Sequence, residues 1–435
     1  MEPIFLSKES NYDINVAEKK KSRILRTLGP GLITGAADDD PSGIATHAQA
    51  GAAFGYGQLW ALTVCLPLMI AVQEACARIG LATGHGLAKA ATLRYSKKIV
   101  YFMVILILIA NTINIGADIA AVGAALQLLI PLPILLLSTV FTFLVLFLEI
   151  FVGYHAYARF LKMLSLAVLS YAVTAFLVVE PWRDIFISTF IPKIEFNTEY
   201  LYVIVAIFGT TISPYMFFWQ AAEEVEELDY AKKINKSIRT LKDLRIDTVI
   251  GMAFSIVGSW FILVTTATVL HNNGVTNINT AADAAKALEP LVQTFPNAGV
   301  IAKAIFAIGI IGMGLLGIPV LAGSAAYAVS ETFNFNSGLD KKAWEAKGFY
   351  AVIVISTLIG FAMTLVGIDP IKSLIFAAVI NGLVAVPLIL IIFGISGNKE
   401  VMGDYVGGRL SSNMLLFTFF VMLLCAVALL VSLIN

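Results

Sequence analysis

The chain has 435 residues, of which 59% are hydrophobic and 13% are charged, and its formal net charge is zero. Soluble globular proteins have about 25% charged residues, so this composition excludes a soluble enzyme, a nucleic-acid-binding protein and a disordered scaffold. It predicts an integral membrane protein of the plasma membrane with many spans. Three cysteines and four histidines, scattered along the chain, indicate neither a disulfide framework nor a metal-ligand cluster.

Residues 1–26 are polar and end in a basic run, with no apolar stretch before it. A signal peptide needs an apolar core, so we expect a cytoplasmic tail instead. Eleven apolar segments follow, each about 20 residues or longer, which is the length of a membrane-spanning helix. Their aliphatic runs do not alternate with polar residues, so the fold class is all-α rather than a membrane β-barrel. The expected spans are 27–53, 58–82, 98–128, 131–153, 156–180, 198–228, 246–271, 298–330, 348–367, 371–395 and 411–434.

The basic residues are divided unevenly between the two ends of these spans. Of the 29 Lys and Arg residues, six lie in the tail and 18 near the connections after spans 2, 4, 6, 8 and 10. Five lie at the opposite ends of the spans. Because basic residues concentrate on the cytoplasmic side of a membrane, we expect the N-terminus inside. An odd number of spans then places the C-terminus outside the cytoplasm.

Two expected spans contain helix-breaking residues at mid-membrane depth. Span 1 has three aspartates, a proline and a glycine within 37–43, and span 6 has a glycine and a proline within 209–215. Interrupted backbone at this depth is tolerated where it lines a cavity or is buried in protein. The alternative is that Pro41 and Pro214 only kink continuous helices.

The two interruptions fall five spans apart, in the first and the sixth span. This spacing predicts two five-helix repeats of inverted topology, in which broken helices meet near the midplane and bind substrate and coupling ions. The repeats would cover about residues 27–180 and 198–395, and the helix at 411–434 would lie outside them.

The first span carries a motif in three parts: Gly29-Pro30-Gly31, Asp40-Pro41-Ser42-Gly43 and the run 45–52, followed by Tyr56 and Trp60. It resembles the NRAMP divalent-metal transporter family, whose first helix reads Gly-Pro-Gly, then Asp-Pro-Gly-Asn, then Gln-Ala-Gly-Ala. The resemblance covers about residues 24–435 and implies the LeuT-type fold with broken helices 1 and 6. Weaker matches occur at 116–120 in span 3, at 209–214 in span 6, and at Asp247 and 271–274 around span 7.

The resemblance also implies a set of metal ligands, and this chain departs from it. The family uses an Asp and an Asn of span 1, a carbonyl of span 6, and a Met before the span-6 proline. The Asp corresponds to Asp40 and the carbonyl to Thr210, whereas Gly43 replaces the Asn and Ser213 replaces the Met. The chain is therefore expected to form a divergent branch. Further departures are Tyr215 and Gln220 in place of two histidines, Ala121 in place of a glutamate, and the additional acids Asp38 and Asp39.

The remaining candidate ligands all offer oxygen: Asp39, Asp40, the Thr210 carbonyl and the Ser213 hydroxyl. A thioether favours softer metals, whereas carboxylate, hydroxyl, carbonyl and water suit Mg²⁺ and Mn²⁺. Because Gly43 and Ser213 are smaller than Asn and Met, a wider cavity could hold a partly hydrated ion. We therefore expect Mg²⁺ or Mn²⁺ as the transported cation, with no permanently bound cofactor.

Four other polar residues are candidates for proton transfer or gating. Asp118 resembles a family residue on a proton route, and the alternative is a structural hydrogen bond. His47, two turns beyond Asp40, either titrates or packs between helices. Glu223 would attract cations at an inner vestibule, and Asn381 either lines the site or joins helices.

Three functions therefore compete. The first is a secondary active transporter of a divalent cation, with proton coupling left open. The second is a carrier of an amine or amino acid with the same fold, in which Asp40 binds the amine. The third is a metal channel or sensor. No nucleophile–base set, phosphate-binding loop or zinc motif indicates an enzyme, and we expect a monomer.

Overall fold

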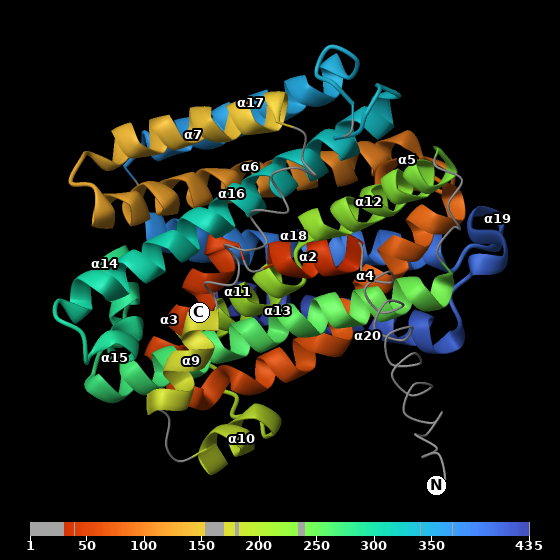
Figure 1. Ribbon diagram of the computed structural model, residues 1–435. Helices are drawn as coiled ribbons and strands as arrows, with labels where there is room; N and C mark the ends of the chain where they lie inside the picture. The colour runs from red at the N-terminus through yellow and green to blue at the C-terminus, as the bar shows by residue number, and fades with distance from the viewer. Residues whose placement is uncertain are drawn as a thin grey trace, which may run out of the picture.

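The computed structural model describes residues 30–38, 40–152, 169–178, 182–233, 240–339, 341–367 and 369–434. The expected tail, 1–26, lies outside these residues, as does Asp39. Within the described residues every regular element is a helix, and the longer helices lie side by side in one bundle (Figure 1).

The described part of the chain contains nine candidate membrane spans by length and composition. One of them covers both α3 and α4, because the short helix η1 (Gly55–Gln58) joins these two helices. The expected span 156–180 falls mostly outside the described residues, so the count of eleven stays a prediction. The helices at the expected spans are α2 (Pro30–Asp38), α3 (Pro41–Phe54), α4 (Leu59–Thr83), α6 (Lys97–Leu129), α7 (Ile134–Phe151), α9 (Leu169–Val178), α11 (Thr198–Thr211), α12 (Pro214–Lys233), α13 (Leu241–Val269), α16 (Ala298–Phe333), α17 (Lys347–Thr364), α18 (Pro370–Ser396) and α20 (Arg409–Ile434).

The connections between these helices contain shorter ones. α14 and α15 lie together at one end of the bundle, and α5 and α19 lie at the opposite end (Figure 1). Their bounds, with those of α10, are α5 (Leu87–Thr92), α10 (Trp182–Phe190), α14 (Ala281–Ala285), α15 (Glu289–Val292) and α19 (Lys399–Met402).

Both expected interruptions are present. α2 ends at Asp38 and α3 begins at Pro41, and α11 ends at Thr211 before α12 begins at Pro214. Proline is favoured at the first position of a helix, where its missing N–H needs no partner. Each proline thus begins a new helix, which favours an interruption over a kink in a continuous helix.

The interrupted helices lie in the middle of the bundle. α2 runs between α12 and α13 (Figure 1), and α3 packs against α11, α13 and α18. Glycines permit this close packing: a β-carbon on Gly209 of α11 would lie 2.0 Å from the Ala378 carbonyl oxygen of α18, and one on Gly35 would lie 2.1 Å from the Gly251 carbonyl oxygen of α13. Such close backbone contact is typical of membrane helices with small residues at their interfaces.

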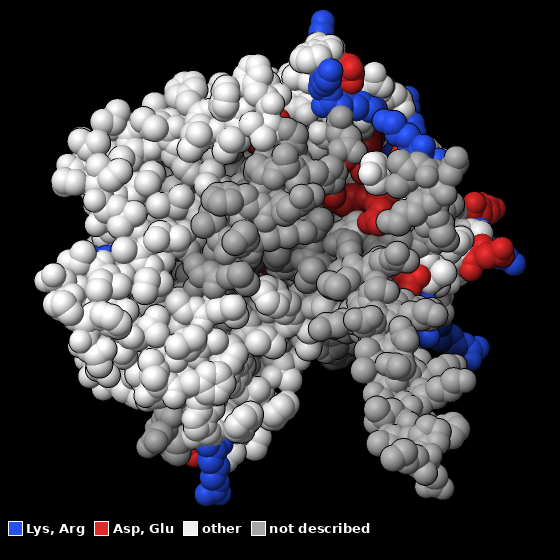
Figure 2. Space-filling model, in the orientation of Figure 1, with Lys and Arg blue, Asp and Glu red and all other residues white. Residues whose placement is uncertain are grey.

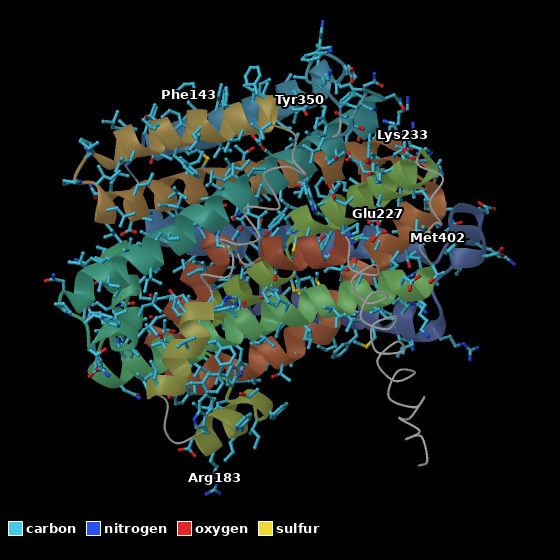
Figure 3. All side chains as sticks on the ribbon, viewed as in Figure 1. Phe143, Arg183, Glu227, Lys233, Tyr350 and Met402 are labelled. Atoms are coloured by element: carbon cyan, nitrogen blue, oxygen red, sulfur yellow. The ribbon has the colours of Figure 1, made fainter. Side chains whose placement is uncertain are left out.

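Apolar side chains cover the outer helices. Phe143 of α7 points away from the bundle (Figure 3), as expected for a residue that faces lipid. Lys and Arg side chains gather at the end of the molecule that carries α5 and α19 (Figure 2), where Lys233 also lies (Figure 3). This is the end that the distribution of basic residues assigns to the cytoplasm.

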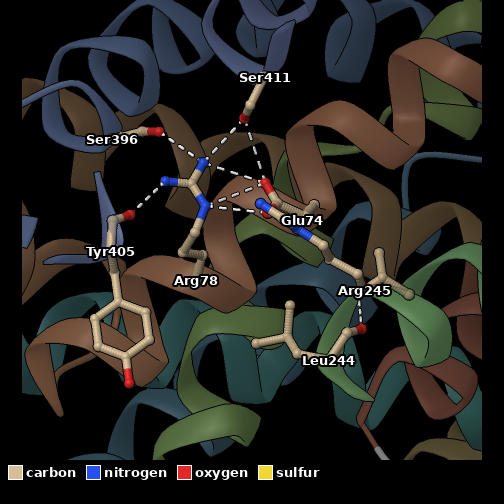
Figure 4. Close-up of polar contacts among 8 residues, drawn as sticks. Glu74, Arg78, Leu244, Arg245, Ser396, Tyr405 and Ser411 are labelled. Atoms are coloured by element: carbon tan, nitrogen blue, oxygen red, sulfur yellow. Dashed lines mark hydrogen bonds and ion pairs between the residues drawn. The ribbon is translucent and has the colours of Figure 1, made fainter. Parts of the chain in front are cut away.

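A buried ion pair joins four helices at this same end (Figure 4). Arg78 of α4 is 1% exposed, and its Nε lies 3.1 Å from Oε1 of Glu74. Its other nitrogens donate to the Ser396 hydroxyl of α18, the Ser411 hydroxyl of α20 and the Tyr405 carbonyl. Arg245 of α13 donates to Glu74 over 3.0 Å. The network therefore ties α4, α13, α18 and α20 together.

Candidate functional site

The carboxylate of Asp40 lies at the start of α3, where span 1 is interrupted. Asp40 is the N-cap residue of this helix and is 1% exposed. Its Oδ1 accepts hydrogen bonds from the Ser42 hydroxyl over 2.6 Å and from the Gly43 amide over 2.9 Å. An aspartate is favoured here because it satisfies free N–H groups and opposes the positive end of the helix dipole.

The end of α11 lies opposite the start of α3. The Thr210 and Ser42 hydroxyl oxygens are 3.2 Å apart, and a β-carbon on Gly43 would lie 3.4 Å from the Thr210 Oγ1. The Ser213 hydroxyl donates to the carbonyls of Thr210 and Gly209. Four of the five predicted ligand positions therefore lie where the two interrupted helices meet: Asp40, Gly43, Thr210 and Ser213. The fifth, Asp39, lies outside the described residues.

Asn114 of α6, which the sequence did not point to, also contacts Asp40. Asn114 donates from Nδ2 to Oδ2 of Asp40 over 2.8 Å. Its own Oδ1 lies 3.5 Å from Nδ2 of Asn381 on α18, so this predicted residue reaches Asp40 through Asn114. The spacing in the sequence could have identified Asn114, because it lies four residues before Asp118 and therefore on the same face of the helix.

Asp118 itself is buried in α6, with 0% exposure. Neither carboxylate oxygen has a hydrogen-bond partner among the described residues. Gly317 of α16 lies beside both aspartates: a β-carbon there would be 3.1 Å from the Asp40 Cβ and 3.9 Å from the Asp118 Oδ2. The alternative of a structural hydrogen bond for Asp118 has no support among the described contacts.

The other two candidates lie further along the interrupted helices. His47 of α3 donates from Nδ1 to the Gly43 carbonyl over 2.7 Å, and its Nε2 has no hydrogen-bond partner within the described part of the chain. Glu223 is buried in α12, nine residues beyond Pro214. Both are buried polar groups on the interrupted helices themselves, and their roles stay predictions.

Polar contacts also hold α2 in place. The carboxylate of Asp247 on α13 accepts a hydrogen bond from the Gly31 amide over 2.7 Å, and the Ser255 hydroxyl donates to Asp38. Tyr215, at the position of a family histidine, donates from its hydroxyl to the Ala37 carbonyl over 3.2 Å. Asp38 and Asp247 thus orient α2 against α13.

Neutral polar groups surround Asp40. In the described residues no group of three or more His, Cys, Asp or Glu side chains could hold a metal ion. The groups near Asp40 are instead the hydroxyls of Ser42 and Thr210 and the side-chain amide of Asn114, whose nitrogen faces Asp40. A carboxylate and hydroxyl oxygens are groups that can bind a cation together with retained water.

Comparison with known families identifies the chain. The Nramp model, described as natural resistance-associated macrophage protein-like, matches residues 31–432. The chain belongs to the Nramp family. This confirms the resemblance seen in span 1, and it confirms the expectation that the protein belongs to a family of transporters rather than enzymes.

Two curated Nramp relatives have full-length similarity to the chain. The divalent metal cation transporter MntH of Caldanaerobacter subterraneus is 25% identical over 410 residues, which is 92% of each chain. The MntH protein of Klebsiella pneumoniae is 26% identical over 412 residues, covering 93% of this chain and 92% of the relative.

Solved structures with the same fold extend this comparison. The manganese transporter of Eremococcus coleocola has a TM-score of 0.74 at 17% identity, over 93% of this chain and 86% of that one. MhsT, solved in complex with L-phenylalanine, has a TM-score of 0.61 at 12% identity, over 93% of this chain and 97% of that one. The protein is thus an all-helical membrane protein with the LeuT-type fold, as the resemblance implied.

Proposed function

We propose that this Nramp protein is a secondary active transporter that moves a hard divalent cation, Mg²⁺ or Mn²⁺, across the plasma membrane by alternating access. The observation that carries the proposal is the buried Asp40 carboxylate, which lies where the two interrupted helices meet and accepts hydrogen bonds from two neutral side chains, Ser42 and Asn114. The names of the relatives, divalent metal cation transporter and manganese transporter, support a divalent substrate.

The ligand set supports a hard cation over a soft one. The metal would bind Asp40, Asp39 and the oxygens of Thr210 and Ser213, with Gly43 leaving room for water. Without a thioether at position 213, the site offers little to Cd²⁺, whereas oxygen ligands serve Mg²⁺ and Mn²⁺. In the present structure the Ser213 hydroxyl donates its proton to carbonyls, so its lone pairs stay available to a cation.

The proposed topology has eleven membrane helices in two inverted repeats, about 27–180 and 198–395, plus the helix near 411–434. The N-terminus is cytoplasmic and the C-terminus lies outside, in agreement with the basic side chains near α5 and α19 (Figure 2). The transporter works as a monomer and holds no permanent cofactor. His47, Glu223 and Asn381 are proposed as proton or gating residues.

The function is tested with purified protein in liposomes. Uptake of Mn²⁺ is measured in competition with Mg²⁺, Cd²⁺ and a mixture of amino acids, while the internal pH is recorded. We expect Mg²⁺ to compete and amino acids to have no effect. Competition by amino acids alone would favour the organic-solute carrier. Uptake that does not saturate with Mn²⁺ concentration would favour a channel.

Selectivity should change when the family's ligands are restored. The double substitution Gly43→Asn with Ser213→Met is expected to raise the ratio of Cd²⁺ to Mg²⁺ uptake about tenfold, because it adds a soft ligand and fills space needed by water. The β-carbon of residue 43 fits, since its nearest contact would be 3.4 Å. The matched control is Gly408→Asn with Ser432→Met, where residue 408 has open space around it. An unchanged ratio in the site variant would contradict the hard-cation assignment.

A further inference from the structure

A cavity lies on the side of the bundle, between four helices. Its walls come from α6, α11, α17 and α18, and its volume is about 380 Å³. This volume falls within the range of about 300–1,000 Å³ that is usual for small-molecule sites. Asp40, Ser42 and Thr210 are not among the residues that line it, so the cavity is separate from the contact between the interrupted helices.

The cavity lies in the half of the bundle opposite the basic end. α6 begins shortly after α5, and α18 ends shortly before α19, so the last part of α6 and the first part of α18 lie away from that end (Figure 1). Lys372 lies in the first turn of α18, and Thr364 is the last residue of α17. These two residues therefore mark the mouth of the cavity, near the membrane surface. From Ala120 to Ile113 the lining continues along α6 for about 10 Å toward the membrane interior.

The lining changes from polar at the mouth to apolar inside. Lys372 and Tyr202 line the outer part, because each lies within the first turns of a helix that begins at this end. The inner part is formed by α6, where Ala117 and Ala120 are buried and have small apolar side chains. A charged mouth above an apolar floor matches an amphiphile, which has one polar and one apolar end.

Lys372 has no ion-pair partner among the described residues. Lys286, another basic residue at this end, lies with its Nζ 2.9 Å from Oδ1 of Asp283. The acid nearest to Lys372 in the chain is Asp369, whose Oδ1 instead accepts two backbone amides of the first turn of α18. The Tyr202 hydroxyl likewise has no hydrogen-bond partner in the described part of the chain. An ammonium and a hydroxyl are donors that an anionic oxygen accepts.

The surface around the mouth faces lipid. Phe376 lines the cavity and is exposed, as are Leu365 and Val366 just beyond α17. A cation would be repelled by Lys372 and would find no carboxylate in the lining. A small soluble anion would leave the apolar floor unfilled. A lipid with a phosphate headgroup satisfies both the charge at the mouth and the apolar surface below it.

We propose that this cavity binds one anionic phospholipid from the leaflet opposite the basic end, which the proposed topology makes the outer leaflet. The phosphate accepts hydrogen bonds from the Lys372 ammonium and the Tyr202 hydroxyl. The upper part of one acyl chain lies against Ala117 and Ala120, and the rest of the lipid extends along the exposed apolar surface. The inference goes beyond cation transport and depends neither on which cation is carried nor on where it binds.

The test is photochemical labelling of the full-length protein in phosphatidylcholine liposomes. These contain a small amount of phosphatidylglycerol with a photoreactive diazirine in its acyl chain, and labelled peptides are identified by mass spectrometry. We expect labelling of the α6 segment 113–120, which unlabelled phosphatidylglycerol suppresses and inorganic phosphate does not. Labelling at the basic end of the bundle serves as the internal reference.

Two pairs of variants test the charge and the space. Lys372→Gln should reduce labelling of 113–120 about fivefold, the contribution of one basic residue to binding anionic lipid. Lys303→Gln is its control, because Lys303 lies near the start of α16 and does not line the cavity. Ala120→Leu should abolish the labelling by filling the floor. Ala362→Leu is its control, since it adds the same atoms to an exposed position of α17 outside the cavity.

The outcomes decide each part of the inference. Equal labelling of 113–120 in Lys372→Gln and Lys303→Gln would overturn the assignment of the phosphate. Suppression by inorganic phosphate would show that the site takes a free anion, and would overturn the lipid. Equal labelling in Ala120→Leu and Ala362→Leu would overturn the position of the acyl chain. Gel filtration and melting temperature verify folding, and if Ala120→Leu does not fold, the lysine pair decides.

The result is independent of the proposed function. Labelling that follows Lys372 in a protein without Mn²⁺ uptake would leave this inference standing while the transport proposal fails. Uptake of Mn²⁺ by a protein whose segment 113–120 is not labelled would leave the transport proposal standing and overturn this inference.

Discussion

Asp40→Ala is expected to reduce divalent cation uptake more than about a hundredfold, because it removes the charge at the meeting point of the interrupted helices. A factor of one hundred corresponds to about 2.7 kcal/mol, which is within the range for losing a buried, charged ligand. Uptake of Mn²⁺ into proteoliposomes, normalised to the amount of folded protein, is the measurement.

Two further variants separate ligand loss from structural damage. Asparagine caps helices as well as aspartate does, so Asp40→Asn should keep the stability of α3 and still lose uptake. Asp39→Asn should reduce uptake less than Asp40→Asn, because Asp40 occupies the position of the family's ligand. Full uptake by Asp40→Asn would remove the proposed site, and the reverse order of the two asparagine variants would move its centre to Asp39.

Arg78→Ala is expected to lower the free energy of unfolding by about 3 kcal/mol. Removing one partner of a buried ion pair leaves the other charge uncompensated, which costs about 3–5 kcal/mol. Here Glu74 keeps Arg245 as a partner at 3.0 Å, so the lower part of that range applies. The Ser396 hydroxyl and the Tyr405 carbonyl each lose a hydrogen-bond partner as well. Unfolding in mixed micelles gives the free energy.

Arg245→Ala is the matched control, because it pairs with the same glutamate from a side chain that is 51% exposed. Exposed ion pairs contribute about 0.2–1 kcal/mol, so this variant should lose little stability. Equal losses for the two arginine variants would show that burial of Arg78 does not determine the strength of the network.

The broken helices could be predicted because their cause is local. Proline and glycine within an apolar segment interrupt a helix wherever it lies in the fold, and the resemblance in span 1 indicated the same positions. The orientation of α2 was not predictable, because it depends on contacts such as that between Asp247 and Gly31, which are 216 residues apart in the chain.

The surroundings of Asp40 were predicted only in part, for the same physical reason. Asp40, Gly43 and Thr210 were found from motifs. Asn114 and Gly317 were not, because each matters only through its packing against another helix. A glycine in an apolar helix has no distinguishing sequence signal when its role is to allow close packing against a residue of another helix.

The measurement that tests the central proposal most directly is Mn²⁺ uptake into proteoliposomes in the presence of either Mg²⁺ or Cd²⁺. The proposed oxygen-only site predicts saturable Mn²⁺ uptake that Mg²⁺ inhibits at lower concentration than Cd²⁺ does. Stronger inhibition by Cd²⁺ would contradict the hard-cation site, and the absence of saturable uptake of any divalent cation would contradict the proposed transport function itself.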